Sequence, residues 1–104
     1  MVHCLFISKD GSIVSSSHDK TIRIWNPQTG ECLQVLEGHE RYATCLATLK
    51  DGSIVSGSWD STLRIWDPQT GECLHKIEVP EYSINRIAIL KDDRIITNPC
   101  LDLI

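Results

Sequence analysis

The fold is decided by the stretch DGSIVSSSHDKTIRIWNPQTGECL, Asp10–Leu33, which returns almost unchanged as DGSIVSGSWDSTLRIWDPQTGECL, Asp51–Leu74. The two copies are identical at 19 of 24 positions, and the tryptophans Trp25 and Trp66 place them 41 residues apart. A fixed period of this size predicts one supersecondary unit that recurs along the chain. Each unit then stacks on its neighbours, because that is how it buries its faces.

A weaker third copy follows in the same register. It is visible as KDDRIIT, Lys91–Thr97, which lies 41 residues after KDGSIVS, Lys50–Ser56. We therefore divide the chain into a first repeat over residues 1–37, a second over residues 38–79, and a partial, degenerate third over residues 80–104.

The composition is that of a globular protein, with 41% hydrophobic and 23% charged residues. Lysine and arginine are scattered singly and the net charge is −4, so nucleic acid is not an expected partner. The apolar runs are too short to span a bilayer, and the start MVHCLFISKD has no signal-peptide core. We expect no membrane association and a cytoplasmic location.

Four of the five cysteines are explained by the repeat. Cys4 is equivalent to Cys45, and Cys32 is equivalent to Cys73. These pairs mark matching positions in two copies, and the chain has no CxxC spacing, so we predict reduced, packed thiols and no disulfide or zinc site. No metal and no cofactor are expected.

Each repeat is predicted to contain four short β-strands and no helix, because β-branched residues are concentrated between turn signals. In the second copy the expected strands cover residues 44–49, 53–58, 62–66 and 72–77. Asp51-Gly52 predicts a tight hairpin in which both residues take positive φ. The fold class is therefore all-β.

Apolar residues lie on both faces of such a sheet, as Leu63 and Ile65 do opposite Trp66. Radial stacking covers both faces of every sheet, whereas a sandwich leaves two faces open, so we predict a partial β-propeller of four-stranded antiparallel blades. The expected parts are two full blades, Val2–Leu36 and Ala43–Ile77, and the first two strands of a third, Ile84–Thr97. Closed rings take about four to eight blades, so we expect a fragment of a longer propeller.

The order Gly38-His39, then Asp60, then Trp66-Asp67 resembles the signature of the WD-repeat β-propeller family. The resemblance implies a structural tetrad of His39, Ser56, Asp60 and Trp66. Chained hydrogen bonds between these groups would hold the loops onto the sheet and satisfy each buried polar atom.

The tetrad is incomplete in the other two copies. The first retains Ser15, Asp19 and Trp25, but its Gly-His position falls before Met1. The third has Thr97 at the serine position and Leu101 where the aspartate belongs.

A Ser, His and Asp within reach of one another also suggest a catalytic triad with Ser56 as nucleophile and His39 as base. A triad needs an exposed serine beside an oxyanion hole, often on a strained turn. Ser56 is predicted in mid-strand, so we favour the structural interpretation and expect no enzymatic activity.

Recognition is expected where otherwise identical copies differ on a loop rim. Trp59 replaces His18 immediately before the turn aspartate, and Arg41, Tyr42 and Tyr82 belong to adjacent loops. An exposed tryptophan is a frequent interface hot spot. Packing of Trp59 on a neighbouring loop is an equally good explanation at this stage.

The function we predict is a non-catalytic protein–protein interaction scaffold that presents a loop rim to a protein or peptide ligand. The alternative is a self-assembling structural blade module, which forms an oligomeric propeller through its exposed blade faces.

Overall fold

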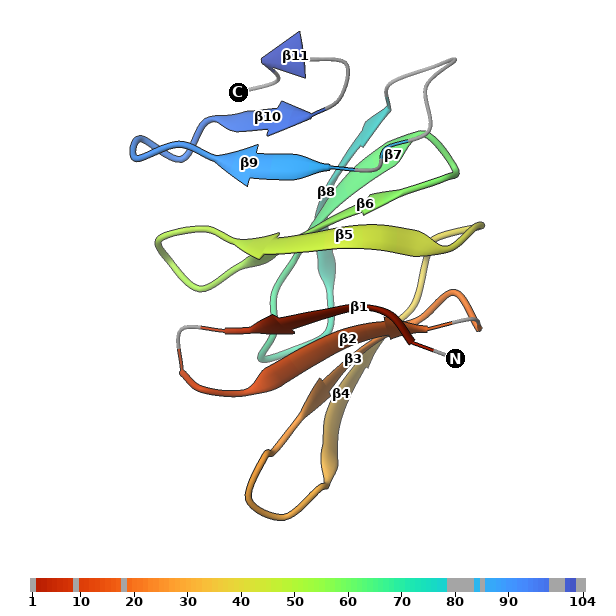
Figure 1. Ribbon diagram of the computed structural model, residues 1–104, viewed down its shortest axis with the longest axis vertical. Coiled ribbons are helices and arrows are strands. Elements are labelled where there is room, and N and C mark those ends of the chain that lie inside the picture. Colours follow the sequence, from red (N-terminus) through yellow and green to blue (C-terminus); the bar gives the residue numbers. More distant parts are fainter. Residues whose placement is uncertain are drawn as a thin grey trace.

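The computed structural model describes residues 2–8, 10–17, 19–78, 84, 86–97 and 101–102. Their regular structure is entirely β-strand, arranged in three antiparallel sheets (Figure 1). The first sheet contains β1 (Val2–Ile7), β2 (Ile13–Ser17), β3 (Ile22–Trp25) and β4 (Cys32–Leu36). The second contains β5 (Ala43–Thr48), β6 (Ile54–Ser58), β7 (Thr62–Trp66) and β8 (Cys73–Glu78). The third contains β9 (Ile87–Ile89), β10 (Ile95–Thr97) and β11 (Leu101–Asp102).

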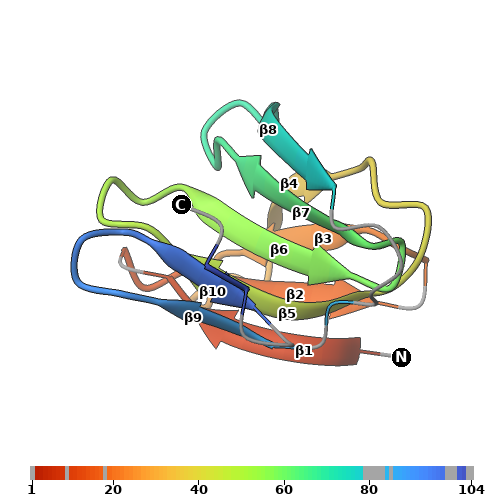
Figure 2. The same cartoon turned by 90° about the horizontal axis from the view of Figure 1, so that it is seen from above.

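Within every sheet, strands that are consecutive in sequence are neighbours in space. The first strands β1, β5 and β9 lie side by side, while the outer strands β4 and β8 lie on the opposite side of the stack (Figures 1 and 2). The sheets therefore fan outward from a shared inner edge, which confirms the predicted stack of propeller blades.

Two details of the prediction are wrong. Asp51 and Gly52 were both expected to have positive φ, but at the β5–β6 turn only Gly52 does. The Leu49 N–H donates to the Ser53 carbonyl and closes a three-residue loop, as in a type I turn followed by a left-handed residue. The third sheet also has a third strand, β11, where two were expected. A two-residue strand carries no alternating pattern from which it could be predicted.

Two hydrophobic cores lie between the sheets. The core between the first and second sheets is formed by Val14, Ile22, Ile24, Leu36, Ala43, Leu46, Ile54 and Trp66. The core between the second and third is formed by Cys45, Val55, Leu63, Ile65, Ile84 and Ile95. The second sheet is thus covered on both faces, because alternate residues of a strand point to opposite sides.

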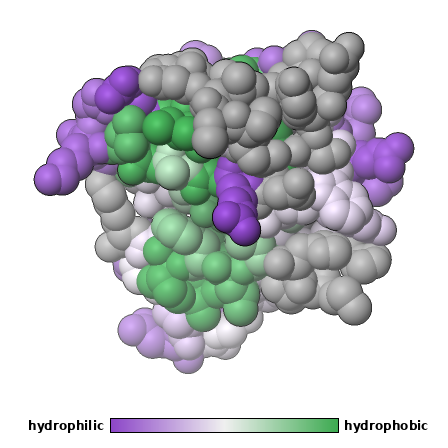
Figure 3. Space-filling model, turned by 45° about the horizontal axis from the view of Figure 1, so that its top comes forward, coloured by the Kyte–Doolittle hydropathy of each residue, from purple (hydrophilic) through white to green (hydrophobic). Residues whose placement is uncertain are grey.

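The first sheet has an uncovered apolar face. Leu5 on β1 is 68% exposed, and Ile7 on the same strand is also exposed. Figure 3 shows hydrophobic side chains gathered on the surface of the molecule. Exposed apolar surface of this kind marks an interaction site or a liability to aggregate.

Hydrogen bonds also connect the sheets. Gln34 on β4 donates from Nε2 to the carbonyl of Gln69, over 3.1 Å. The Thr44 hydroxyl donates to the carbonyl of Ile84 over 2.5 Å, and the Ile84 N–H donates to the carbonyl of Ser58 over 3.1 Å. These contacts fix the spacing of neighbouring sheets in addition to the apolar cores.

The described cysteines Cys4, Cys32, Cys45 and Cys73 form no disulfide. Burial raises the pKa of the Cys45 thiol to about 11, and burial also raises that of Cys4. The prediction of packed thiols is wrong for Cys32, because it lies on the outermost strand of its sheet and is exposed. No helix long and apolar enough to cross a membrane occurs in the described part of the chain.

Candidate functional site

The structure brings the four predicted tetrad residues of the second sheet into one hydrogen-bonded chain. Trp66 on β7 donates from Nε1 to the Ser56 hydroxyl on β6, over 2.8 Å. Ser56 Oγ lies 2.6 Å from His39 Nε2, and His39 Nδ1 lies 3.0 Å from Asp60 Oδ2. A neutral imidazole that carries its proton on Nδ1 satisfies every link, since Nδ1–H donates to the carboxylate and Nε2 accepts from Ser56.

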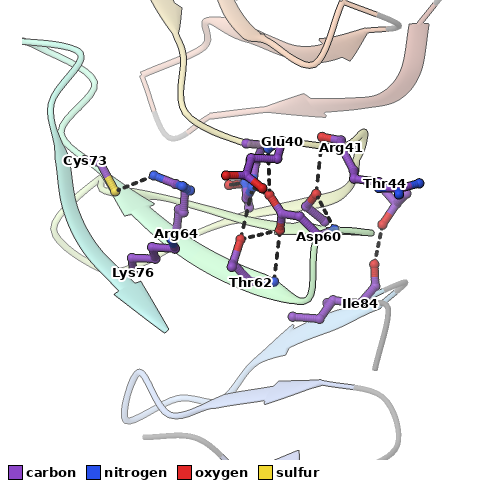
Figure 4. A network of polar contacts seen from close by, with 12 residues as sticks. Glu40, Arg41, Thr44, Asp60, Thr62, Arg64, Cys73, Lys76 and Ile84 are labelled. Carbon is purple, nitrogen blue, oxygen red and sulfur yellow. Dashed lines mark hydrogen bonds and ion pairs between the residues drawn. The ribbon is translucent and has the colours of Figure 1, made fainter. Parts of the chain in front are cut away.

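Asp60 is held from several sides (Figure 4). The backbone N–H of Glu40 donates to Oδ2 over 2.9 Å. The backbone N–H and the hydroxyl of Thr62 donate to Oδ1 over 3.0 and 2.5 Å. Burial by itself raises the pKa of Asp60, but the hydrogen bonds from Thr62, Glu40 and His39 outweigh burial and lower that pKa to about 2.

His39 is buried, and its ring meets the Trp66 ring in an edge-to-face arrangement, at 6.0 Å between ring centroids. Burial lowers the pKa of His39 below its usual 6.5. The nearby cations Arg64 and Lys76 act in the same direction, whereas the Asp60 carboxylate opposes them. The imidazole is therefore neutral at pH 7, in agreement with the hydrogen-bonding pattern.

The first sheet contains a shorter version of the same network. Trp25 Nε1 donates to Ser15 Oγ over 2.9 Å, but no histidine joins them among the described residues. Asp19 is exposed and accepts from Thr21, from the Ser17 hydroxyl, and from Arg23 Nη2 at 3.2 Å. In this sheet an arginine therefore lies beside the turn aspartate.

Arg64, the equivalent of Arg23, makes different contacts in the second sheet. Its guanidinium lies 5.9 Å from the centre of the Trp66 ring, and Nη1 is 3.7 Å from Cys73 Sγ. Gly38 has a φ of 156°, which residues with a side chain rarely adopt, and its lack of a Cβ leaves room for the end of the Arg64 side chain. Arg64 thus contacts Trp66 and Cys73, whereas Arg23 forms an ion pair with its turn aspartate.

The third sheet has Thr97 at the position of Ser56. Its side chain is buried, and Oγ1 has no hydrogen-bond partner within the described part of the chain. The third copy therefore lacks the network among these residues.

The triad interpretation is weakened by the surroundings of Ser56. The residue is fully buried in mid-strand, and its hydroxyl is shared between His39 and Trp66. A nucleophile has to reach its substrate, and this hydroxyl has no open side. Nor do the described residues include a group of three or more His, Cys, Asp or Glu side chains that could hold a metal ion.

Of the predicted binding residues, Trp59, Tyr42 and Arg41 meet at a pocket of about 330 Å³. We name it the rim pocket, and its lining residues are Lys20, Glu40, Arg41, Tyr42 and Trp59. The Trp59 ring lies 5.8 Å from the Tyr42 ring, tilted by 51°, and is still 46% exposed. The Trp59 ring therefore packs on the neighbouring Tyr42 ring and still leaves part of its surface exposed to solvent.

The other predicted binding residues, His18 and Tyr82, lie outside the described residues. Sequence reasoning missed Lys20 and Glu40 as members of the rim pocket. A signal existed for Lys20, because it is one of the five positions at which the two copies differ, with Ser61 as its equivalent.

A larger pocket of about 440 Å³ lies at the opposite rim, between the β1–β2, β5–β6 and β7–β8 turns. Its carboxylates Asp10, Asp51 and Asp67 each accept a backbone N–H two residues further along their own turn. This arrangement accounts for the aspartates as turn-forming residues.

The family described as WD domain, G-beta repeat, matches this chain over residues 1–26 and 30–67. The chain belongs to this family. The WD40 β-propeller domain of Doa1 superposes with a TM-score of 0.87 and 34% identity, over 93% of this chain and 33% of that one. The curvature of the stack is thus that of a WD40 propeller.

Curated relatives match over shorter stretches. F-box/WD repeat-containing protein 10 of Mus musculus is 40% identical over 45 residues, which are 42% of this chain and 4% of the relative. WD repeat-containing protein 18 of Bos taurus is 47% identical over 36 residues, 34% of this chain and 8% of the relative. This WD40 chain therefore spans a small part of the length of its relatives.

Proposed function

We propose that this chain is a non-catalytic protein-interaction scaffold whose recognition surface is the rim pocket. WD40 repeat domains are generally protein-interaction scaffolds. The observation that carries the proposal is Trp59, a large aromatic side chain left 46% exposed in a pocket between two sheets. Tryptophan buries a large contact area at a small entropic cost and is enriched among interface hot spots.

The tetrad contributes rigidity to this surface. Trp59 directly precedes Asp60, and its backbone N–H donates to the Tyr42 carbonyl over 3.1 Å. Ser58 Oγ accepts from the Asp60 N–H and donates to the Arg41 carbonyl. The two loops of the second sheet that line the pocket are therefore bonded to each other beside the buried network, and a rigid surface loses less entropy when it binds.

Selection of peptides from a displayed random library tests the proposal. Peptides selected on the wild-type chain should lose at least about tenfold in affinity for Trp59→Ala, as expected for a hot spot. Trp59→His is a second variant, because the first copy has histidine at this turn. Leu33→Ala is the matched control, since Leu33 is an exposed hydrophobic residue away from the rim pocket. Equal binding by all four proteins would contradict the proposal.

A second candidate function is a self-assembling blade module, favoured by the uncovered face of the first sheet. Leu5 is 68% exposed, whereas its equivalent Leu46 is 9% exposed because the first sheet covers it. A second copy that supplied a blade would bury Leu5 in the same way. Analytical ultracentrifugation should then give one oligomer of defined mass, and polydisperse aggregate would contradict this candidate.

Nucleic acid is not among the partners we propose, because lysine and arginine are scattered singly along the sequence. A cytoplasmic location is likewise a proposal that rests on composition alone.

A further inference from the structure

Two of the five residues that line the rim pocket are positions at which the two copies differ. Lys20, in the β2–β3 turn, replaces the serine of the second copy, and Trp59, in the β6–β7 turn, replaces the histidine of the first. The two copies differ at only five of 24 positions. Two of these five meet in one pocket because stacking sets one turn of each sheet side by side.

Lys20 is not explained by the turn itself. Lys20 and Ser61 both have left-handed φ, 71° and 68°. This conformation costs an ordinary residue about 1 kcal/mol and is more common for glycine, asparagine or aspartate. Lysine therefore gives the turn no conformational advantage, and a function of its ammonium group is the better explanation.

The charge of the rim pocket is opposite in sign to that of the chain. Lys20 and Arg41 contribute two exposed cations, and neither forms an ion pair with any other described residue. Glu40 contributes a single carboxylate. The whole chain carries −4, whereas the lining of this pocket contains two cations and one carboxylate.

The two aspartates of these turns already have their own partners. Asp19 forms an ion pair with Arg23, and the carboxylate of Asp60 accepts hydrogen bonds from Thr62 and from the tetrad and is not part of the pocket lining. The aromatic pair Trp59–Tyr42 lies beside the two cations and offers an apolar wall. At about 330 Å³ the pocket accommodates one or two side chains of an extended segment.

We propose that the rim pocket binds an acidic peptide segment of a protein partner. An apolar side chain of that segment packs on Trp59 and Tyr42, and flanking Asp or Glu carboxylates face Lys20 and Arg41. This inference rests on the proposed function and names the partner chemistry of the same site. Charge complementarity sets which segments are accepted, and the aromatic pair provides the contact area.

Two synthetic peptides test the partner chemistry. One is Ac-Asp-Glu-Leu-Pro-Glu-Asp-amide, and the other replaces every acid by its amide, Ac-Asn-Gln-Leu-Pro-Gln-Asn-amide. Titrations into the full chain are followed by the NMR signal of the Trp59 indole N–H, assigned with Trp59→His. The acidic peptide should bind about five- to tenfold more tightly, since each exposed charge pair contributes up to about 1 kcal/mol. Raising the salt concentration should reduce this difference.

Matched variants locate the charge effect. Lys20→Ser, which copies the second repeat, should weaken the acidic peptide about two- to fivefold and leave the neutral peptide unchanged. Lys91→Ser removes the same charge at the β9–β10 turn on the opposite rim and should change neither. Equal affinity of the two peptides, no shift from either, or equal effects of the two lysine variants would overturn the inference.

The two proposals fail in different ways. If both peptides shift the Trp59 indole signal and bind with equal affinity, the scaffold function stands and the acidic specificity is wrong. If library-selected peptides bind Trp59→Ala as tightly as the wild-type chain, the scaffold function itself is wrong.

Discussion

Asp19 and Asp60 occupy the same turn position in two nearly identical copies, and their surroundings differ. Asp60 is covered by the Gly-His loop and shares a buried network with His39. Asp19 is exposed and pairs with Arg23. The residue type is explained in both copies by its bonds to the threonine two residues later, Thr21 or Thr62, but only Asp60 also accepts a bond from the loop of Glu40.

Asp60→Asn should destabilise the chain by about 2 to 3 kcal/mol, because an amide cannot accept all of the bonds that the carboxylate accepts in a buried network. Asp19→Asn is the matched change in the first copy and should cost less than about 1 kcal/mol, since Asp19 is exposed. Urea denaturation of both variants measures the difference. Equal losses would show that the buried network adds nothing beyond the turn.

Stability should fall as the solution becomes acidic. The pKa of His39 in the folded chain lies below 6.5, its value in the unfolded chain. As pH falls from 6.5 toward the folded pKa, the unfolded chain binds a proton that the folded chain does not, and stability is lost. Asp60 adds a second loss as pH falls from 3.8 toward about 2, because protonation of the carboxyl breaks its bonds.

The urea midpoint between about pH 8 and pH 5 measures the histidine effect. His39→Gln should remove most of the decline in that window, whereas His75→Gln, an exposed control, should leave it in place. An unchanged decline in His39→Gln would assign the effect to another group.

At the scale of the strand, Gly57 is a position at which the second sheet differs from the first. A Cβ at Gly57 would lie 2.5 Å from Ile84 Cγ2 and 2.6 Å from Cys45 Sγ. The first copy has Ser16 at the glycine position and Ala43 at that of Ile84. The smaller Gly57 thus faces the larger Ile84, and the larger Ser16 is accompanied by the smaller Ala43, as close packing requires.

Gly57→Ala should cost about 1 to 3 kcal/mol through overpacking against Ile84. Ile84→Ala removes the obstructing side chain, so the double variant should lose at least about 1 kcal/mol less than the sum of the single losses. Additive losses would mean that the two positions are not coupled.

Ser16→Ala serves as the control for this cycle. Its hydroxyl is buried and has no partner among the described residues, so its removal should leave stability unchanged or raise it by about 1 kcal/mol.

At the scale of the whole molecule, stacking gives identical residues different environments. Leu5 and Leu46 are equivalent, and only Leu46 lies between two sheets. The outer sheets of the stack therefore differ from the middle one in stability as well as in exposed surface.

Leu46→Ala should cost about 2 to 3 kcal/mol, because it removes buried side-chain contacts between sheets. Leu5→Ala should cost less than about 0.5 kcal/mol, because the side chain is already exposed. Denaturation at low and at high chain concentration measures both. A large loss in Leu5→Ala would mean that this face is covered, which agrees with self-assembly and contradicts an open first sheet.

Much of the fold could be predicted from local signals. The positions of β5, β6, β7 and β8 follow from turn residues and alternation, and the tetrad partners follow from their spacing in the family signature. The contacts of Lys20 and Arg64 could not be predicted, because they depend on which loop of one sheet reaches the turn of the next. His18 and Tyr82 stay predictions.

The sequence by itself determined the repeating unit, its strand order and the residues available for a buried hydrogen-bond chain, because a 41-residue period and its turn signals are local information. Only the tertiary structure decided which copy uses these residues fully, which leucine is buried, and that Lys20 of one copy meets Trp59 of the other. The physical reason is that burial and charge complementarity arise between sheets, from residues distant in sequence that stacking places in contact.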